Sequence, residues 1–183
     1  MAALSLLLWI GCGQAKDRSG RQSSDPSTGF EAVSLPEDLT DAETDLIVEG
    51  TAGGRQEIRL DLETITRFPT ESFTSPDPWT GGRHEYGGVP LYGLLDALGL
   101  PEEATTVRVI AANAYEADVR LSDLKEHQYL LATMIDGAPA AGDPSLSKRG
   151  KLFIALNLEA GGELDPEVYK HQLVWQVVRL VVY

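Results

Sequence analysis

Residues 88–100 read GVPLYGLLDALGL and carry the clearest helix signal in the chain. Leucines recur at helical spacing within this stretch, at Leu91, Leu94, Leu95 and Leu98. Pro90 suits the first turn of a helix, where its missing N–H is not needed, and Gly99 suits the end. The stretch therefore predicts a short helix over 91–98. The glycine pair before it, Gly87 and Gly88, is typical of a turn.

Immediately upstream, residues 75–82 read SPDPWTGG, which suits neither a helix nor the interior of a strand. Two prolines remove backbone donors, and paired glycines reach conformations that are closed to other residues. The segment is therefore a shaped loop. Trp79 within it either packs the loop onto the core or lines a site, since loop tryptophans serve both purposes.

Strand and helix signals interleave irregularly over the rest of the domain. Residues 45–51 and 56–62 alternate around a glycine pair as a hairpin does, and Asp61 offers an N-cap to a helix that ends before Pro69. Further strands are expected at 71–75, 105–112, 115–121, 128–135, 151–158 and 174–183, and short helices at 122–127 and 165–172. This order favours an α+β domain with a mixed β-sheet and short helices over a doubly wound parallel sheet.

The N-terminal residues 1–12 form an apolar run that ends at Cys12 and is too short to span a bilayer. The run is similar to an export signal, and the small residue before Cys12 resembles a bacterial lipoprotein cleavage site. We expect an exported protein, periplasmic or tethered to the membrane by lipid on Cys12. A plain cleaved signal and a short buried segment are the alternatives. Residues 13–32 have the composition of a flexible linker, which leaves 33–183 as the domain.

Composition and motifs exclude several function classes. The chain has 28 acidic and 15 basic residues and a formal net charge of −13, which argues against nucleic-acid binding because phosphate contacts need a basic face. Cys12 is the only cysteine, so the domain has no disulfide and no thiol nucleophile. The three histidines are scattered, and no motif of a metal site, a hydrolase or a nucleotide-binding loop is present. We therefore predict no catalytic residue and no metal ligand.

Five segments, taken in order, carry a more specific signal. They read DPWTGGRHEYGGVPLYGLLDALGL (77–100), VRVIAANAYEADVRLSDL (107–124), LLATMIDGAPA (130–140), SKRGKLFIALNL (147–158) and YKHQLVWQVVRLVV (169–182). The most distinctive pieces are 88–91, 131–132 with 135–137, and 175–176 with Arg179. Together they resemble the oxidoreductase molybdopterin-binding domain, the fold of sulfite oxidase, over roughly residues 45–183. The resemblance implies a sulfite-oxidase-like α+β domain.

The resemblance also bears on cofactor chemistry. Enzymes of that family bind molybdenum through a cysteine thiolate from the loop before the helix, and here that loop is SPDPWTGG. We therefore expect a small exported member without thiolate ligation, which has no cofactor and binds a small ligand or a partner. The first alternative is an active molybdopterin-dependent oxidoreductase. The second is a structural or signalling accessory domain of a membrane-associated protein partner.

The candidate cleft combines the shaped loop with two other segments. We expect Asn113 and Tyr115 to resemble an Asn-Asp-Tyr turn near the family's cofactor cleft, and Lys148 and Arg149 to supply two exposed cations. Such a cleft suits a small anionic or planar ligand. The predicted ligand-binding residues are Trp79, Thr80, His84, Tyr86, Asn113, Tyr115, Lys148 and Arg149.

Each of these residues also has a purely structural interpretation. Trp79 can pin its loop, Asn113 and Tyr115 can serve the turn itself, and the basic pair can be a solvated turn. Trp175 and Arg179 are expected to hold the last strand, because valines and leucine surround them there.

Overall fold

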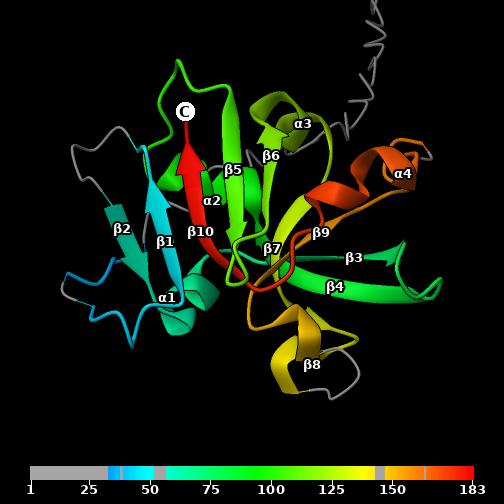
Figure 1. Ribbon diagram of the computed structural model, residues 1–183, viewed down its shortest axis with the longest axis horizontal. Coiled ribbons are helices and arrows are strands. Elements are labelled where there is room, and N and C mark those ends of the chain that lie inside the picture. The colour runs from blue at the N-terminus through cyan, green and yellow to red at the C-terminus, as the bar shows by residue number, and fades with distance from the viewer. Residues whose placement is uncertain (1–32, 38, 52–56, 143–146, 163) are drawn as a thin grey trace, which may run out of the picture.

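The computed structural model describes residues 33–37, 39–51, 57–142, 147–162 and 164–183. Within these residues, ten strands form two sheets, connected by short helices (Figure 1). The expected signal peptide 1–12 with Cys12 and the linker 13–32 lie outside the described residues. The mixed α+β class predicted from the sequence is confirmed.

The first sheet has the strand order β2-β1-β10-β5-β6. Its strands are β1 (Leu46–Glu49), β2 (Glu57–Leu60), β5 (Thr106–Ala111), β6 (Glu116–Arg120) and β10 (Val177–Val182). β1 pairs with β2 as the predicted antiparallel neighbour, and it pairs with β10 in parallel. The other pairs, β10 with β5 and β5 with β6, are antiparallel, so the sheet is mixed.

The second sheet is antiparallel throughout. It contains β3 (Glu71–Pro76), β4 (Arg83–Pro90), β7 (Tyr129–Ile135), β8 (Ala138–Pro139) and β9 (Phe153–Leu156). β4 lies between β3 and β7, while β8 and β9 both pair with β7. Figure 1 shows β3 and β4 running across the direction of β1, β10 and β5.

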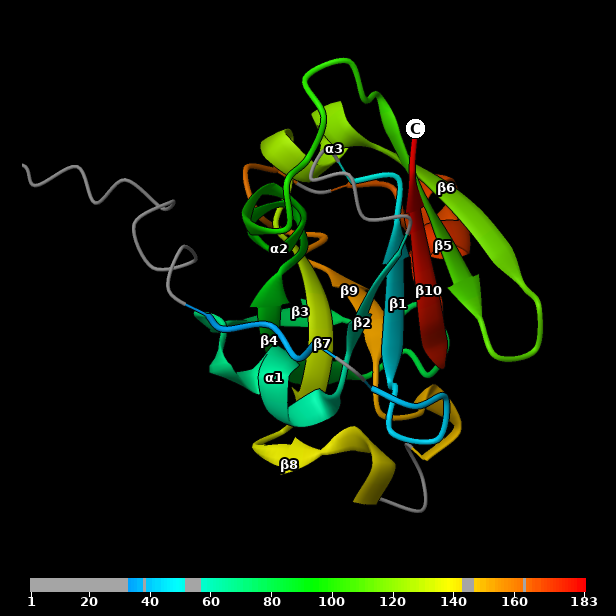
Figure 2. The same ribbon diagram turned by 90° about the vertical axis from the view of Figure 1, so that its left-hand side faces the viewer.

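Short helices connect the strands. They are α1 (Leu62–Arg67), α2 (Leu91–Ala97), α3 (Leu121–Glu126) and α4 (Pro166–Tyr169). The predicted N-cap is confirmed, since the Asp61 side chain accepts the Thr64 N–H at 2.8 Å. Figure 2 shows α1 and α2 beside β4 and β7.

Two apolar clusters hold the molecule together. The larger one joins the first sheet to α2, β7 and β9, with members such as Val109, Leu180, Leu94 and Leu131 fully buried. The leucine spacing of α2 is thus explained, because its leucines form the core-facing stripe of the helix. The smaller cluster includes Tyr86 and Phe153 from the second sheet, and Trp175 packs against it.

The turn predicted at Gly87 and Gly88 is wrong, because both residues lie inside β4. Strands β4 and β7 approach so closely there that a Cβ on Gly88 would lie 2.3 Å from the Leu131 carbonyl oxygen. The pairing with β7 also shifts register between these two glycines. The glycines therefore allow the backbones of β4 and β7 to approach closely, which is a known role of glycine within strands.

Candidate functional site

The loop that joins β3 to β4 covers residues 77–82 and is built around Asp77. The backbone closes on itself, since Asp77 N–H donates to the Gly82 carbonyl at 2.8 Å and Gly81 N–H to the Asp77 carbonyl at 2.9 Å. The Asp77 carboxylate accepts the Trp79 N–H at 2.9 Å and the Thr80 hydroxyl at 3.0 Å. The predicted shaped loop is confirmed for residues 77–82, where Asp77 determines its shape, while Ser75 and Pro76 belong to β3.

Arg149 supplies the counter-charge of the Asp77 carboxylate. Asp77 is 1% exposed and Arg149 is 5% exposed, and the guanidinium forms an ion pair with Asp77. The guanidinium carbon lies 4.7 Å from the centroid of Trp175, 5.7 Å from that of Phe153 and 5.9 Å from that of Tyr86. Arg149 therefore sits among three aromatic rings, where cation–π contacts add to the ion pair.

The expectation that Arg149 is an exposed cation is consequently wrong. A buried carboxylate needs a counter-charge, and the short 3₁₀ turn Ser147–Arg149 brings the guanidinium to Asp77. Its neighbour Lys148 is exposed as expected, and the Lys148 carbonyl accepts a hydrogen bond from Gln176 Nε2 at 2.8 Å. The adjacent basic residues thus have opposite environments.

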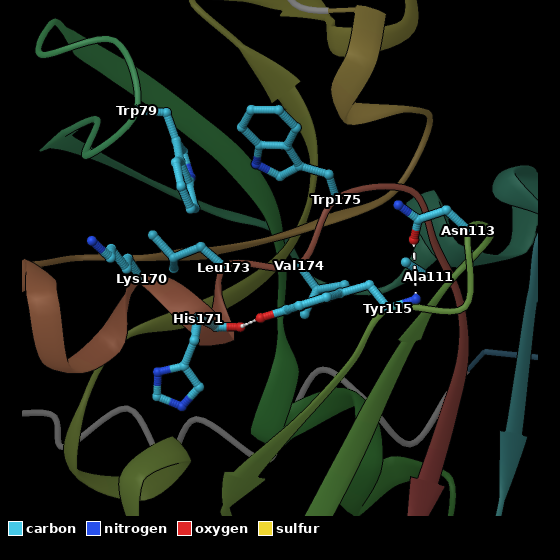
Figure 3. Close-up of a pocket in the computed structure, with 9 residues that line it drawn as sticks. All are labelled: Trp79, Ala111, Asn113, Tyr115, Lys170, His171, Leu173, Val174 and Trp175. Atoms are coloured by element: carbon cyan, nitrogen blue, oxygen red, sulfur yellow. Dashed lines mark hydrogen bonds between the residues drawn. The ribbon is translucent and has the colours of Figure 1, made fainter.

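A pocket of about 240 Å³ opens beside the loop (Figure 3). Trp79 and Trp175 form its aromatic wall, with ring centroids 5.8 Å apart and planes at 74°. Trp79 is 50% exposed and Tyr115 is 46% exposed. Its lining residues are Trp79, Ala111, Asn113, Tyr115, Lys170, His171, Leu173, Val174 and Trp175.

The turn between β5 and β6 supplies the polar side of the pocket. Asn113 Oδ1 accepts the Tyr115 N–H at 3.1 Å, and Ala114 between them has a left-handed φ of 63°. The Tyr115 hydroxyl donates to the His171 carbonyl at 2.8 Å and so ties this turn to the 3₁₀ helix Lys170–Gln172. Asn113 and Tyr115 therefore stabilise the turn and also line the pocket.

The structure brings together three of the eight predicted residues in this pocket, namely Trp79, Asn113 and Tyr115. Thr80 stands on the same loop, where it is bonded to Asp77. Tyr86 and Arg149 instead line a second cavity of about 10 Å³, which has room for one water at most. Lys148 is not among the residues that line the pocket.

His84 lies between two carboxylates, while Tyr86 lies in the smaller apolar core. His84 Nδ1 lies 2.7 Å from Asp136 Oδ2, and His84 Nε2 lies 3.9 Å from Asp77 Oδ2. Burial, with a smaller contribution from the Asp77 carboxylate, raises the pKa of Tyr86 to about 12. Tyr86 therefore remains a neutral phenol at physiological pH.

Sequence reasoning missed Asp77, Lys170, Leu173 and Trp175. An aspartate between two prolines and two residues before a tryptophan is a recognisable side-chain turn signal, so Asp77 could have been found. Trp175 was expected to hold the last strand, but it precedes β10 and forms a wall of the pocket. Arg179 does have the expected role, because it pairs with Glu49 across β10 and β1.

The described residues contain no group of three or more His, Cys, Asp or Glu side chains placed to hold a metal ion. Among the same residues, no helix is long and apolar enough to cross a membrane.

Comparison with known proteins identifies the fold. No protein-family model matches the sequence, and no curated protein sequence matches it. Among solved structures, the sulfane dehydrogenase SoxCD from Paracoccus pantotrophus matches with a TM-score of 0.58 and 19% sequence identity. The match covers 80% of this chain and 40% of that chain. The likeness concerns the fold alone, and the chain is a mixed α+β domain similar to a sulfite-oxidase-like fold.

Proposed function

We propose that this domain is a molybdopterin-oxidoreductase-like module that no longer binds molybdenum and binds a small planar ligand in the Trp79–Trp175 pocket. The observation that carries the proposal is the half-exposed Trp79 on a loop held by a buried ion pair. Leaving half of an indole in water forgoes about 2–3 kcal/mol of apolar burial. A loop that is anchored in this way holds the exposed aromatic ring in place as one wall of a binding site.

The dimensions of the pocket support a ligand of one or two rings. Its volume of about 240 Å³ is below the roughly 300–1,000 Å³ of sites for drug-sized molecules. Trp79, Trp175 and Tyr115 supply flat apolar faces, while Asn113 and Lys170 supply a few polar groups. Such a lining is typical of a small-molecule site.

The residues present do not fit the thiolate ligation that the sequence resemblance implies for molybdenum. The loop 77–82 contains no cysteine, and the only cysteine of the chain is Cys12. Asp77 is the one carboxylate of this loop, and the ion pair with Arg149 already neutralises it. A molybdopterin-dependent oxidoreductase is the second candidate function, favoured by the structural likeness to a sulfane dehydrogenase. Metal content decides between the two candidates.

The variant Trp79→Ala tests the proposed function. Planar one- and two-ring compounds are screened by ligand-observed NMR, and the compounds that bind are titrated by calorimetry. We expect Trp79→Ala to weaken their binding by about 1–3 kcal/mol, because a stacking wall is removed. A small effect on unfolding is expected, since the side chain is half exposed.

The matched control is Val168→Ala, which removes another exposed apolar side chain outside the pocket. Binding to this variant should equal binding to the wild type. The proposal is wrong if no planar compound binds, or if the compounds bind Trp79→Ala as tightly as the wild type.

A further inference from the structure

The indole nitrogen of Trp175 is an unusual polar atom within the pocket wall. It is buried, and no hydrogen-bond acceptor lies within reach among the residues that the structure describes. A buried N–H left without an acceptor costs about 1–3 kcal/mol. Figure 3 shows this nitrogen on the edge of the ring that faces Trp79. The N–H therefore has the half-exposed Trp79 ring, and no oxygen, in front of it.

Two other polar side chains of the pocket, Asn113 and Lys170, retain donors, whereas Tyr115 retains an acceptor oxygen. Asn113 Oδ1 already accepts the Tyr115 N–H, which leaves the two N–H groups of its amide for a ligand. The Tyr115 hydroxyl donates its proton to the His171 carbonyl. Lys170 Nζ donates to Glu167 Oε2 at 2.5 Å and has further N–H groups to offer. In Figure 3 the His171 ring points away from the pocket.

The free N–H groups of the pocket favour a ligand that brings hydrogen-bond acceptors, such as an acid, over a ligand that brings only donors. A ligand that brings only N–H or O–H groups would leave the N–H groups of Trp175 and Asn113 without an acceptor. A carboxylate brings two strong acceptor oxygens, and Lys170 offers it a positive charge. The protein carries a formal net charge of −13, so an anion must be recognised by such local contacts and not by the overall field.

We infer that the ligand of this pocket is a planar aromatic carboxylate whose carboxylate accepts the indole N–H of Trp175, an inference that rests on the proposed binding function. The aromatic ring of the ligand lies against Trp79 and Tyr115. The carboxylate faces Trp175, and Figure 3 shows Asn113 and Lys170 as further donors at opposite ends of the pocket. Because Trp79 covers the Trp175 N–H, the carboxylate reaches this N–H only when the half-exposed Trp79 side chain turns outward.

The test compares 2-naphthoate with 2-naphthamide, two probes of the same shape that differ in charge and in donors. Calorimetric titration of the wild-type protein should show the acid binding at least ten times more tightly than the amide. Trp175→Phe keeps an aromatic ring and removes the N–H, so it should reduce this preference at least fivefold while the amide still binds.

A second variant covers the case in which Trp175→Phe disturbs packing around Arg149. Lys170→Met should also reduce the preference for the acid, whereas Lys125→Met, on α3 outside the pocket, should leave it unchanged. Equal binding of the two probes to the wild type overturns the carboxylate inference and leaves the proposed function standing. An undiminished preference in both Trp175→Phe and Lys170→Met overturns the assignment of the donors. Failure of both probes to bind counts against the proposed function itself.

Discussion

Asp77 and Arg149 are separated by 72 positions in the sequence and form the contact on which the candidate site depends. The carboxylate orients Trp79 and Thr80, and the guanidinium compensates its charge in a nearly dry environment. Such a pair is weak evidence for extra stability, because both ions lose their hydration. Removing one partner is a different matter, since the other then remains charged and buried.

Arg149→Met should therefore lower the free energy of unfolding by about 3–5 kcal/mol. Asp77→Asn combined with Arg149→Met should recover part of the loss, because no buried charge is then left alone. Urea denaturation followed by circular dichroism measures these differences. Lys148→Ala is the matched control, since this neighbouring cation is exposed, and it should change stability by no more than about 0.5 kcal/mol. Equal losses in Arg149→Met and Lys148→Ala would contradict the buried pair.

Strand β4 shows how a single element carries both the fold and the site. Its N-terminal end follows the Trp79 loop, its centre presents Tyr86 to the smaller core, and its C-terminal end leads into α2. Gly87 and Gly88 allow it to lie close against β7 despite the shift in register. The orientation of the loop therefore depends on the close contact between β4 and β7.

Gly88→Ala should force these two strands apart and destabilise the domain by about 1–3 kcal/mol, the usual cost of overpacking. The obstacle is backbone, because the new Cβ would meet the Leu131 carbonyl and Ala132 Cα. Gly87→Ala is the comparison, since its Cβ would approach only the Met134 side chain, at 3.3 Å. Thermal unfolding should rank Gly88→Ala clearly below Gly87→Ala. A reversed order would show that the close contact at Gly88 relaxes without cost.

The molecule as a whole has a fold similar to part of a larger chain. It matches 40% of the sulfane dehydrogenase chain at 19% identity. A shared fold does not establish a shared reaction, because chemistry depends on the residues of the site. Residues 13–183 have no cysteine, so the domain offers no thiolate ligand to a metal.

Protein purified from a molybdenum-replete host should contain far less than one molybdenum atom per chain. Elemental analysis measures the metal, and fluorescence of the oxidised extract detects a pterin. Stoichiometric molybdenum together with a pterin signal would instead identify a molybdopterin enzyme and remove the proposed ligand-binding function. A molybdopterin enzyme purified from the same host serves as the positive control.

The sequence by itself was sufficient for the features that depend on near neighbours in the chain. Leucine spacing located α2, alternation located β1 and β2, and proline with glycine marked the Trp79 loop. The N-cap at Asp61 was also readable, because the cap and the N–H that it accepts are three residues apart. These signals are local, and they identify the α+β class without any knowledge of how the strands are ordered.

Only the tertiary structure decided which of these elements meet. Trp79, Asn113 and Trp175 converge because the loop of one sheet lies against the turn and the strand entry of the other. The burial of Arg149 and the closeness of β4 and β7 at Gly88 have the same origin, as does the N–H of Trp175 that finds no acceptor among the described residues. Each of them depends on contacts between segments far apart in the chain, and periodicity along the chain carries no information about such contacts.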